Sequence, residues 1–194
     1  MSSVLPRSFY ERCPTEVARD LLGAEIQHET GGGLVAGRVV ETEAYLGAEP
    51  ACHAYRGRTE SNAALFGEGG RAYVYLSYGV HWLFTAVCGK AGDGCGVLIR
   101  AIEPTDGVPL MRARRGGGRG RELTSGPGRL TQALGIGRSQ NGAALSDGPL
   151  TIGAASGPTG PVTVSRRIGI SKAIHLPLRF YLTHSHHVSR RART

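Results

Sequence analysis

Apolar positions recur at short intervals along the chain and are separated by glycines and polar residues, a pattern that predicts several short strands and a few short helices. A helical period through Val17, Leu21 and Leu22 predicts the first helix, with Thr15 as its N-cap and Gly23 at its end. Most later segments have strand-like composition or no helical period. The pattern therefore indicates a sheet accompanied by short helices.

The expected strands are rich in β-branched and apolar residues and end at clusters of glycine. They cover Ala24–His28, Leu34–Glu43, Tyr73–Cys88, Val97–Glu103 and Leu178–Thr183, with an irregular or strand segment over Pro149–Val164. The first two should form a hairpin through Gly31-Gly32-Gly33.

The other expected segments are a loop over Ala48–Gly70 with a short helix at Asn62–Phe66, a turn over Gly89–Gly94, a helix around Met111, a flexible basic segment from Arg114 to Arg121, and a short helix over Leu130–Leu134. No repeat or linker divides the chain. We therefore expect one mixed α/β (α+β) domain over residues 1–194, with flexible tails at 1–13 and 184–194.

Two carboxylates and an aromatic ring lie in one strand-like run, Glu41-Thr42-Glu43-Ala44-Tyr45-Leu46-Gly47. Because side chains alternate between the two faces of a strand, Glu41, Glu43 and Tyr45 should share one face. A carboxylate beside an aromatic ring suits a site where a water attacks next to a flat substrate. The alternative is an exposed strand end whose acids are solvated.

Aromatic residues are concentrated in the run Tyr73-Val74-Tyr75-Leu76-Ser77-Tyr78-Gly79-Val80-His81-Trp82, although only 6% of the chain is aromatic. The next apolar strand is interrupted by one arginine, Arg100, and a charged side chain is rarely buried without a partner. Glu43 is the natural acidic partner. These features predict a pocket that holds a base between rings and performs hydrolysis beside a phosphodiester.

The charge balance indicates an anionic partner, since the net charge is +8 and the pI is about 9.8. The cysteines have no zinc spacing with the histidines and are expected to be reduced thiols; they are Cys13, Cys52, Cys88 and Cys95. No apolar run has the length of a membrane span, and the N-terminal residues do not resemble a signal peptide. We expect a cytoplasmic protein with no metal and no cofactor.

Seven blocks of the chain, in order, match the alkyladenine (3-methyladenine) DNA glycosylase family, from about Pro14 to about Leu182. They are Ala18–Gly23, Glu41–Gly47, His53–Thr59, Tyr73–His81, Val97–Pro104, Glu122–Pro127 and Pro177–Tyr181. Each block alone is weak, but their common order is strong support. The chain thus resembles monofunctional enzymes that flip a damaged purine out of DNA and hydrolyse its N-glycosidic bond.

The resemblance implies a curved, mainly antiparallel sheet with flanking helices. The implied partner is double-stranded DNA with a damaged purine of the 3-methyladenine, 7-methylguanine, hypoxanthine or ethenoadenine type, and the product is an abasic site in an uncut strand. Lysine occurs only at Lys90 and Lys172, which favours plain hydrolysis because strand cleavage usually needs an amine for a Schiff base. A general arginine bias would also explain this scarcity. We expect a monomer, associated with the nucleoid if bacterial.

Matched motif by motif, the resemblance implies a catalytic pair. Glu43 corresponds to the general base that orients and deprotonates the attacking water. Arg100 corresponds to the arginine that holds this water and the adjacent DNA backbone, and its charge should keep Glu43 ionised. Ile168 falls where the family offers a main-chain group to the same water.

The resemblance also implies a pocket for the flipped base. Tyr45 corresponds to the ring stacked on one face of the base, with His53 and Tyr75 on the other. The main chain at His53 would read the base edge. Thr85 stands where well-known members carry an asparagine that crowds a guanine amine, which predicts altered discrimination between guanine-type and adenine-type lesions.

Contacts with the DNA are implied for two further groups. Tyr78, before Gly79, corresponds to the wedge that fills the gap left by the flipped nucleotide. Phosphate contacts are expected from a set of arginines that would together make binding steeply salt-dependent: Arg56, Arg58, Arg114, Arg115, Arg119, Arg121 and Arg129.

Two other classes of function remain open. A non-catalytic protein of the same fold could bind damaged bases without cutting them, although Glu43 and Arg100 argue against this. An RNA-binding module on a similar sheet would fit the net charge. It gives no reason for the acid, the aromatic rings and the arginine to occur together, and it predicts that Glu43→Gln leaves function unchanged.

Overall fold

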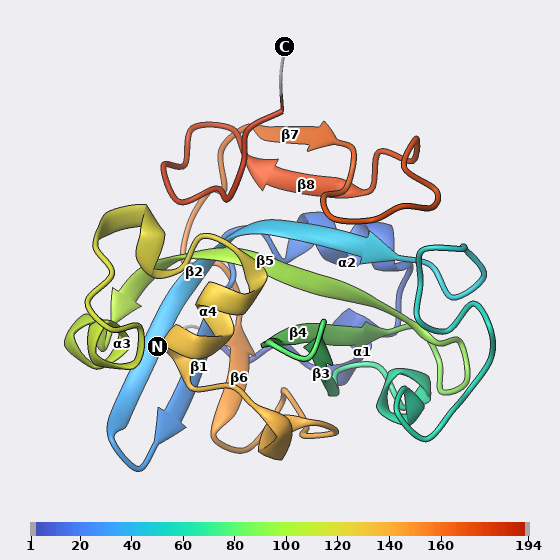
Figure 1. The fold of residues 1–194 in the computed structure, drawn as a ribbon, viewed down its shortest axis with the longest axis horizontal. Helices are drawn as coiled ribbons and strands as arrows, with labels where there is room; N and C mark the ends of the chain where they lie inside the picture. The colour runs from blue at the N-terminus through green and yellow to red at the C-terminus, as the bar shows by residue number, and fades with distance from the viewer. Residues whose placement is uncertain (1–2, 193–194) are drawn as a thin grey trace.

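The computed structural model describes residues 3–192 and contains a curled antiparallel sheet in the order β3-β4-β5-β2-β1-β6, with the β7–β8 hairpin joined to β2 (Figure 1). The strands are β1 (Glu25–Thr30), β2 (Gly33–Tyr45), β3 (Ala72–Ser77), β4 (His81–Cys88), β5 (Cys95–Asp106), β6 (Leu150–Gly153), β7 (Val162–Ser165) and β8 (Arg179–Leu182). The expected mixed α/β (α+β) class with a curved antiparallel sheet is confirmed.

Short helices cover both sides of the sheet. They are α1 (Arg7–Tyr10), α2 (Pro14–Asp20), α3 (Val108–Arg114) and α4 (Pro127–Leu134), with 3-10 turns at Ala63–Phe66, Gly120–Leu123 and Arg138–Gln140. Helix α2 packs against β2 and β5, and α4 packs against β4 and β5. Figure 1 shows α4 in front of the sheet and α1 and α2 behind it, with the sheet between them. Apolar side chains between these layers, such as Leu21, Phe84, Ile99 and Leu130, are fully buried.

The expected strands and short helices are found with small shifts of their bounds. The predicted hairpin at Gly31-Gly32-Gly33 joins β1 to β2, and the predicted range Tyr73–Cys88 comprises β3, a turn at Tyr78–Val80 and β4. The expected irregular segment Pro149–Val164 contains β6 and most of β7.

The N-cap predicted for the helix that contains Val17, which is α2, is wrong. Cys13 is the N-cap residue, Pro14 takes the first helical position, and Thr15 lies inside α2. Proline is favoured at this position because its φ is already helical and the N–H that it lacks would have no partner there. The helix ends at Asp20, and Gly23 follows in a turn with a φ of +86°.

β2 is the central strand, and its neighbours change along its length. β1 pairs with its first half, from Gly33 to Arg38, and β8 takes over the same side from Glu41 to Glu43. β5 pairs along the other side, with register shifts around Glu41 that mark a bulge or irregularity. The acidic part of β2 therefore lies between β5 and β8.

The segments for which the sequence predicts flexible tails contact the rest of the fold where the structure describes them. Leu5 and Tyr10 are buried near the N-terminus. Near the C-terminus, Ser189 donates two hydrogen bonds to Glu41. The first two and last two residues of the tails lie outside the described part. Within that part, no helix has the length and apolarity needed to cross a bilayer.

Candidate active site

The two acids of β2 point to one side of the sheet. Thr42, between them, donates to the carbonyl of Ala18 in α2 at 2.7 Å. Because neighbouring residues of a strand face opposite ways, Glu41 and Glu43 face away from α2. Both carboxylates are completely buried. The alternative of solvated acids at an exposed strand end is therefore wrong.

Three donors converge on the Glu43 carboxylate. The main-chain N–H of Ile168 donates to Oε1 at 2.7 Å, and the Tyr45 hydroxyl and Arg100 Nη1 donate to Oε2 at 2.9 and 3.2 Å. Each carboxylate oxygen has two lone pairs. Oε2 thus accepts from two donors, whereas Oε1 accepts from one and keeps a lone pair without a donor.

The protonation of Glu43 is set by opposing effects. Burial raises the pKa of its carboxyl above the ordinary glutamate value. The charge of Arg100 and the hydrogen bonds from Ile168 and Tyr45 act in the opposite direction, because they favour the ionised form. A raised pKa makes the ionised carboxylate a stronger base than an exposed glutamate.

Glu41 joins two buried arginines from the flanking strands. Its Oε1 accepts hydrogen bonds from Arg100 Nε at 2.9 Å and from Arg179 Nε at 2.8 Å. Ser189 donates its N–H to Oε2 at 2.6 Å and its hydroxyl to Oε1 at 2.8 Å. Burial alone would raise the pKa of Glu41, but the two arginine charges and the Ser189 N–H bring that pKa below the ordinary value. Arg100 is thus held between two carboxylates.

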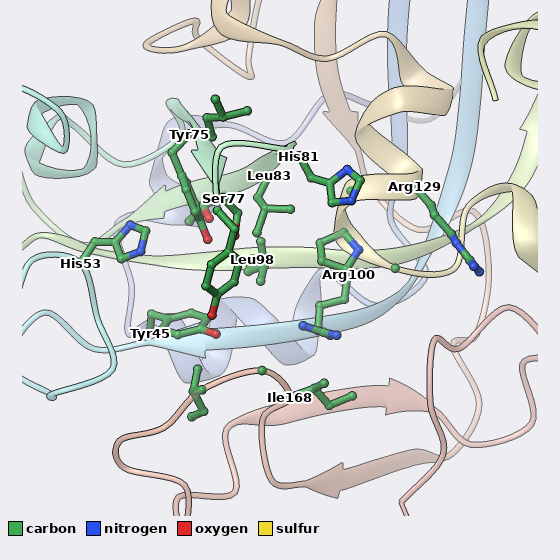
Figure 2. Close-up of a pocket in the computed structure, with 18 of the residues that line it drawn as sticks. Tyr45, His53, Tyr75, Ser77, His81, Leu83, Leu98, Arg100, Arg129 and Ile168 are labelled. Atoms are coloured by element: carbon green, nitrogen blue, oxygen red, sulfur yellow. The ribbon is translucent and has the colours of Figure 1, made fainter. Parts of the chain in front are cut away.

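Tyr73, Tyr75 and His53 form an aromatic cluster. The two tyrosine rings are stacked with their centroids 5.0 Å apart, and the His53 ring meets Tyr75 edge-on at 4.5 Å. The Tyr73 hydroxyl is hydrogen-bonded to His53 Nδ1 at 3.0 Å, and Tyr73 itself is buried. In Figure 2, Tyr75 and Tyr45 extend from different strands towards the same space.

Tyr78 projects from the turn between β3 and β4. Its side chain is 94% exposed, the largest exposure of any large apolar side chain in the described residues. The φ angles of Tyr78 and Gly79 are both positive, at +50° and +71°, and Val80 N–H donates to the Ser77 carbonyl across the turn. A left-handed backbone is unfavourable for tyrosine, by roughly 1–2 kcal/mol. The turn therefore holds the ring outward at an energetic cost.

A cavity of about 770 Å³ opens beside these groups. Its lining includes the expected residues Tyr45, His53, Tyr75, Tyr78, Thr85, Arg100, Arg115, Arg129 and Ile168. Figure 2 labels six of them, which come from β2 (Tyr45), the loop after β2 (His53), β3 (Tyr75), β5 (Arg100), α4 (Arg129) and the segment after β7 (Ile168). Glu43 lies directly behind this wall, bonded to three of its members. The cavity therefore combines a buried carboxylate, aromatic rings and an arginine.

The arginines expected at DNA phosphates do not form one cluster around this cavity. Arg115 and Arg129 line it, whereas the exposed residues Arg56, Arg58, Arg119 and Arg121 do not. Arg114 donates to Thr30 Oγ1 at 2.7 Å and to the Ala133 carbonyl at 3.2 Å, and so links α3 to β1 and α4.

Several residues that support the site were not predicted from the sequence. Arg179 is a single charge in an apolar strand, which is the same signal that singled out Arg100. Asn62 donates to the His53 carbonyl at 3.0 Å and so fixes the loop that carries the histidine. Ser189 and Arg167 lie in polar, irregular segments, where nothing in the pattern distinguishes them from surface residues.

Comparison with known proteins shows the family of the chain. The family model for methylpurine-DNA glycosylase (MPG) matches residues 8–186. A protein of Methanoculleus marisnigri named "Putative 3-methyladenine DNA glycosylase" is 49% identical over 191 residues, covering 96% of this chain and 99% of its own. Proteins with the same name from Carboxydothermus hydrogenoformans and Rubrobacter xylanophilus are 45% and 50% identical, covering 97% and 83% of this chain and 100% and 84% of their own. The chain therefore belongs to the methylpurine-DNA glycosylase family of DNA-repair enzymes.

Proposed function

We propose that this protein flips alkylated or deaminated purines out of duplex DNA and hydrolyses their N-glycosidic bond with a water activated by Glu43. The observation that carries the proposal is the buried Glu43 carboxylate, bonded to Arg100, Tyr45 and Ile168 behind a cavity walled by aromatic rings. The cavity is of the size that small-molecule sites have, and a purine base fits within it.

The free hydrogen-bonding position of Glu43 suggests where the water lies. Oε1 accepts a hydrogen bond from the Ile168 N–H alone. The water would donate the second hydrogen bond that this oxygen accepts. The Ile168 N–H is already used, which leaves the Ile168 carbonyl as the main-chain group able to accept from the same water. As the water attacks C1′, its proton passes to Glu43, and the purine leaves with the bonding electrons.

Stacking and leaving-group chemistry together favour damaged purines. Tyr45 would stack on one face of the base, and Tyr75 and His53 would contact the other. A purine that carries a positive charge from alkylation gains attraction to aromatic rings. It also departs as a neutral molecule without a proton donor. Selectivity then depends on the chemistry of the lesion as well as on fit.

The positions of the lysines support hydrolysis without strand cleavage. Neither Lys90 nor Lys172 is among the residues that line the cavity. A Schiff base with C1′ of the sugar would require an amine beside that carbon.

The proposal is tested by incubating the protein with three DNA substrates: methylated DNA and duplexes that contain one hypoxanthine or one ethenoadenine. We expect free purines by chromatography and an abasic strand that breaks only after alkali. Release of no base from any substrate, with lesion binding retained, would favour the alternative of a non-catalytic damage-binding protein.

Tyr78→Ala should weaken binding to a duplex that carries a lesion by about 1–3 kcal/mol, because the exposed ring no longer stacks in the gap left by the flipped nucleotide. Fluorescence anisotropy with Glu43→Gln protein measures this without turnover. Leu34→Ala, which removes another exposed apolar side chain on the distant β1–β2 hairpin, should leave affinity unchanged. Equal affinity of the Tyr78 variant and its parent would argue against the wedge.

Thr85→Asn should change the relative rates on guanine-type and adenine-type lesions by about tenfold, since Thr85 lines the cavity and is 5% exposed. A larger amide there would crowd the exocyclic amine of a guanine. Single-turnover rates on 7-methylguanine, hypoxanthine and ethenoadenine measure the effect. Identical ratios in the two proteins would show that residue 85 does not determine specificity.

A further inference from the structure

Another buried ion pair, between Arg167 and Glu49, lies beside the cavity and outside its lining. The Arg167 side chain is 0% exposed and that of Glu49 is 7% exposed. Arg167 Nη2 donates to Glu49 Oε2 at 2.6 Å, and Nη1 donates to Oε1. This bidentate arrangement fixes the plane of the guanidinium. Because the cost of desolvation offsets much of the attraction within a buried ion pair, stability alone does not explain this pair.

Arg167 also holds the end of β2 that carries the candidate base. Its Nη1 donates to the Ala44 carbonyl at 3.0 Å, between Glu43 and Tyr45 in the chain. Its guanidinium carbon lies 4.6 Å from the centroid of the Tyr45 ring, over one face. Tyr45 lines the cavity and Arg167 does not. The guanidinium therefore supports the ring from outside the cavity.

The two partners of this ion pair belong to segments that carry other parts of the site. Arg167 directly precedes Ile168, whose N–H donates to Glu43. The main-chain carbonyl of Glu49 accepts a hydrogen bond from the Cys52 N–H, in the turn that leads to His53. One side chain thus connects β2, the segment after β7 and the loop that carries the histidine.

We propose that Arg167, held by Glu49, is a positioning residue that sets the Ile168 N–H and the Tyr45 ring against the Glu43 carboxylate. This inference rests on the proposed function for its consequence in catalysis. Arg167 touches neither the substrate nor the water; it acts through Ile168 and Tyr45. Without it, the segment of Ile168 would lose its bond to the Ala44 carbonyl of β2, and the Ile168 N–H would no longer be held against Glu43.

The test uses the double variant Glu49→Gln/Arg167→Met, which removes both charges and leaves no unpaired ion in the interior. The amide resonance of Ile168 is followed by NMR across pH in the wild type, the double variant and Glu43→Gln. In the wild type this amide should shift as Glu43 titrates, and in Glu43→Gln it should not. We expect the double variant to lose most of that shift.

A second readout is the pH dependence of single-turnover base release. Loss of one hydrogen bond to the Glu43 carboxylate should move the acid limb upward by about one pH unit. Misplacement of the water and the ring should lower the plateau rate by about 10- to 100-fold. Arg38→Gln/Glu103→Gln, which removes the exposed ion pair between β2 and β5, is the matched control and should change neither readout.

A double variant with the wild-type titration of the Ile168 amide and the wild-type acid limb overturns the inference, whatever stability it loses. If the double variant does not fold, Arg167→Lys replaces it, because lysine keeps the charge but cannot bind Glu49 and Ala44 together. Loss of the Ile168 titration in this variant supports the inference, and a wild-type titration and acid limb overturn it. If the wild-type protein releases no base, the proposed function fails, while the NMR titration still decides the role of Arg167.

Discussion

Glu41→Gln should lower the free energy of unfolding by about 3–5 kcal/mol, because the change removes the carboxylate that two buried arginines share. Arg100 keeps Glu43 as a partner, but Glu41 is the acid that pairs with Arg179, which is 2% exposed. Glutamine has nearly the same volume, so a cavity would not explain the loss. Urea denaturation at neutral pH measures it, with the denaturant midpoint falling and the slope unchanged.

The control and the pH dependence identify the cause of that loss. Glu103→Gln removes the exposed ion pair with Arg38 and should change stability by less than about 1 kcal/mol. The folded-state pKa of Glu41 is lowered, so its stabilising effect is present above the unfolded-state pKa and is lost as pH falls through the folded-state value. The difference between wild type and Glu41→Gln should therefore shrink in acid. A variant as stable as the wild type at neutral pH would contradict this interpretation.

Glu43→Gln should lower the single-turnover rate of base release by about 10²- to 10⁴-fold, because an amide cannot accept the proton of the attacking water. Binding to the lesion should persist, since Tyr45, Tyr75 and Tyr78 are untouched. The rate is measured on a duplex with one hypoxanthine, and the affinity by anisotropy on the same duplex. A variant that loses binding and turnover together would point to collapse of the pocket.

The same substitution should lower stability less than Glu41→Gln does, because Arg100 keeps Glu41 as its partner. Burial raises the folded-state pKa of Glu43, so the folded protein binds a proton more tightly than the unfolded chain. Stability therefore falls as pH rises from the unfolded-state pKa to the folded-state pKa of Glu43. At neutral pH the ionised carboxylate destabilises the folded protein. Glutamine avoids this effect. Glu41→Gln and Glu43→Gln, two positions apart, should thus separate stability from activity.

Local patterns in the sequence were enough to predict the elements that carry the site. Alternation along β2 placed Glu43 and Tyr45 on one face, and the hydroxyl of Tyr45 does bond to the Glu43 carboxylate. An arginine within an apolar run indicated that Arg100 needs an acid, and it contacts both Glu43 and Glu41. These predictions succeed because strand periodicity and the cost of burying a charge act over short ranges.

Contacts between distant segments could not be predicted from such patterns. Arg179 and Ser189 lie 138 and 148 positions from Glu41 along the chain, and Arg167 lies 118 positions from Glu49. Their positions depend on how β8 replaces β1 beside β2, which the hydrophobic pattern does not specify. The hydrogen bonds that Ser189 makes with a buried acid could not be predicted from the composition of the C-terminal tail.

The role of Glu43 as the general base is tested most directly by the pH dependence of single-turnover release of 7-methylguanine from duplex DNA. This purine is already cationic and needs no proton to leave, so the acid limb reports the catalytic base alone. We predict that the rate falls with unit slope as pH decreases, with a midpoint above the ordinary glutamate pKa, and that Glu43→Gln lacks this limb. A wild-type rate that is independent of pH, or that rises in acid, would contradict activation of the water by Glu43.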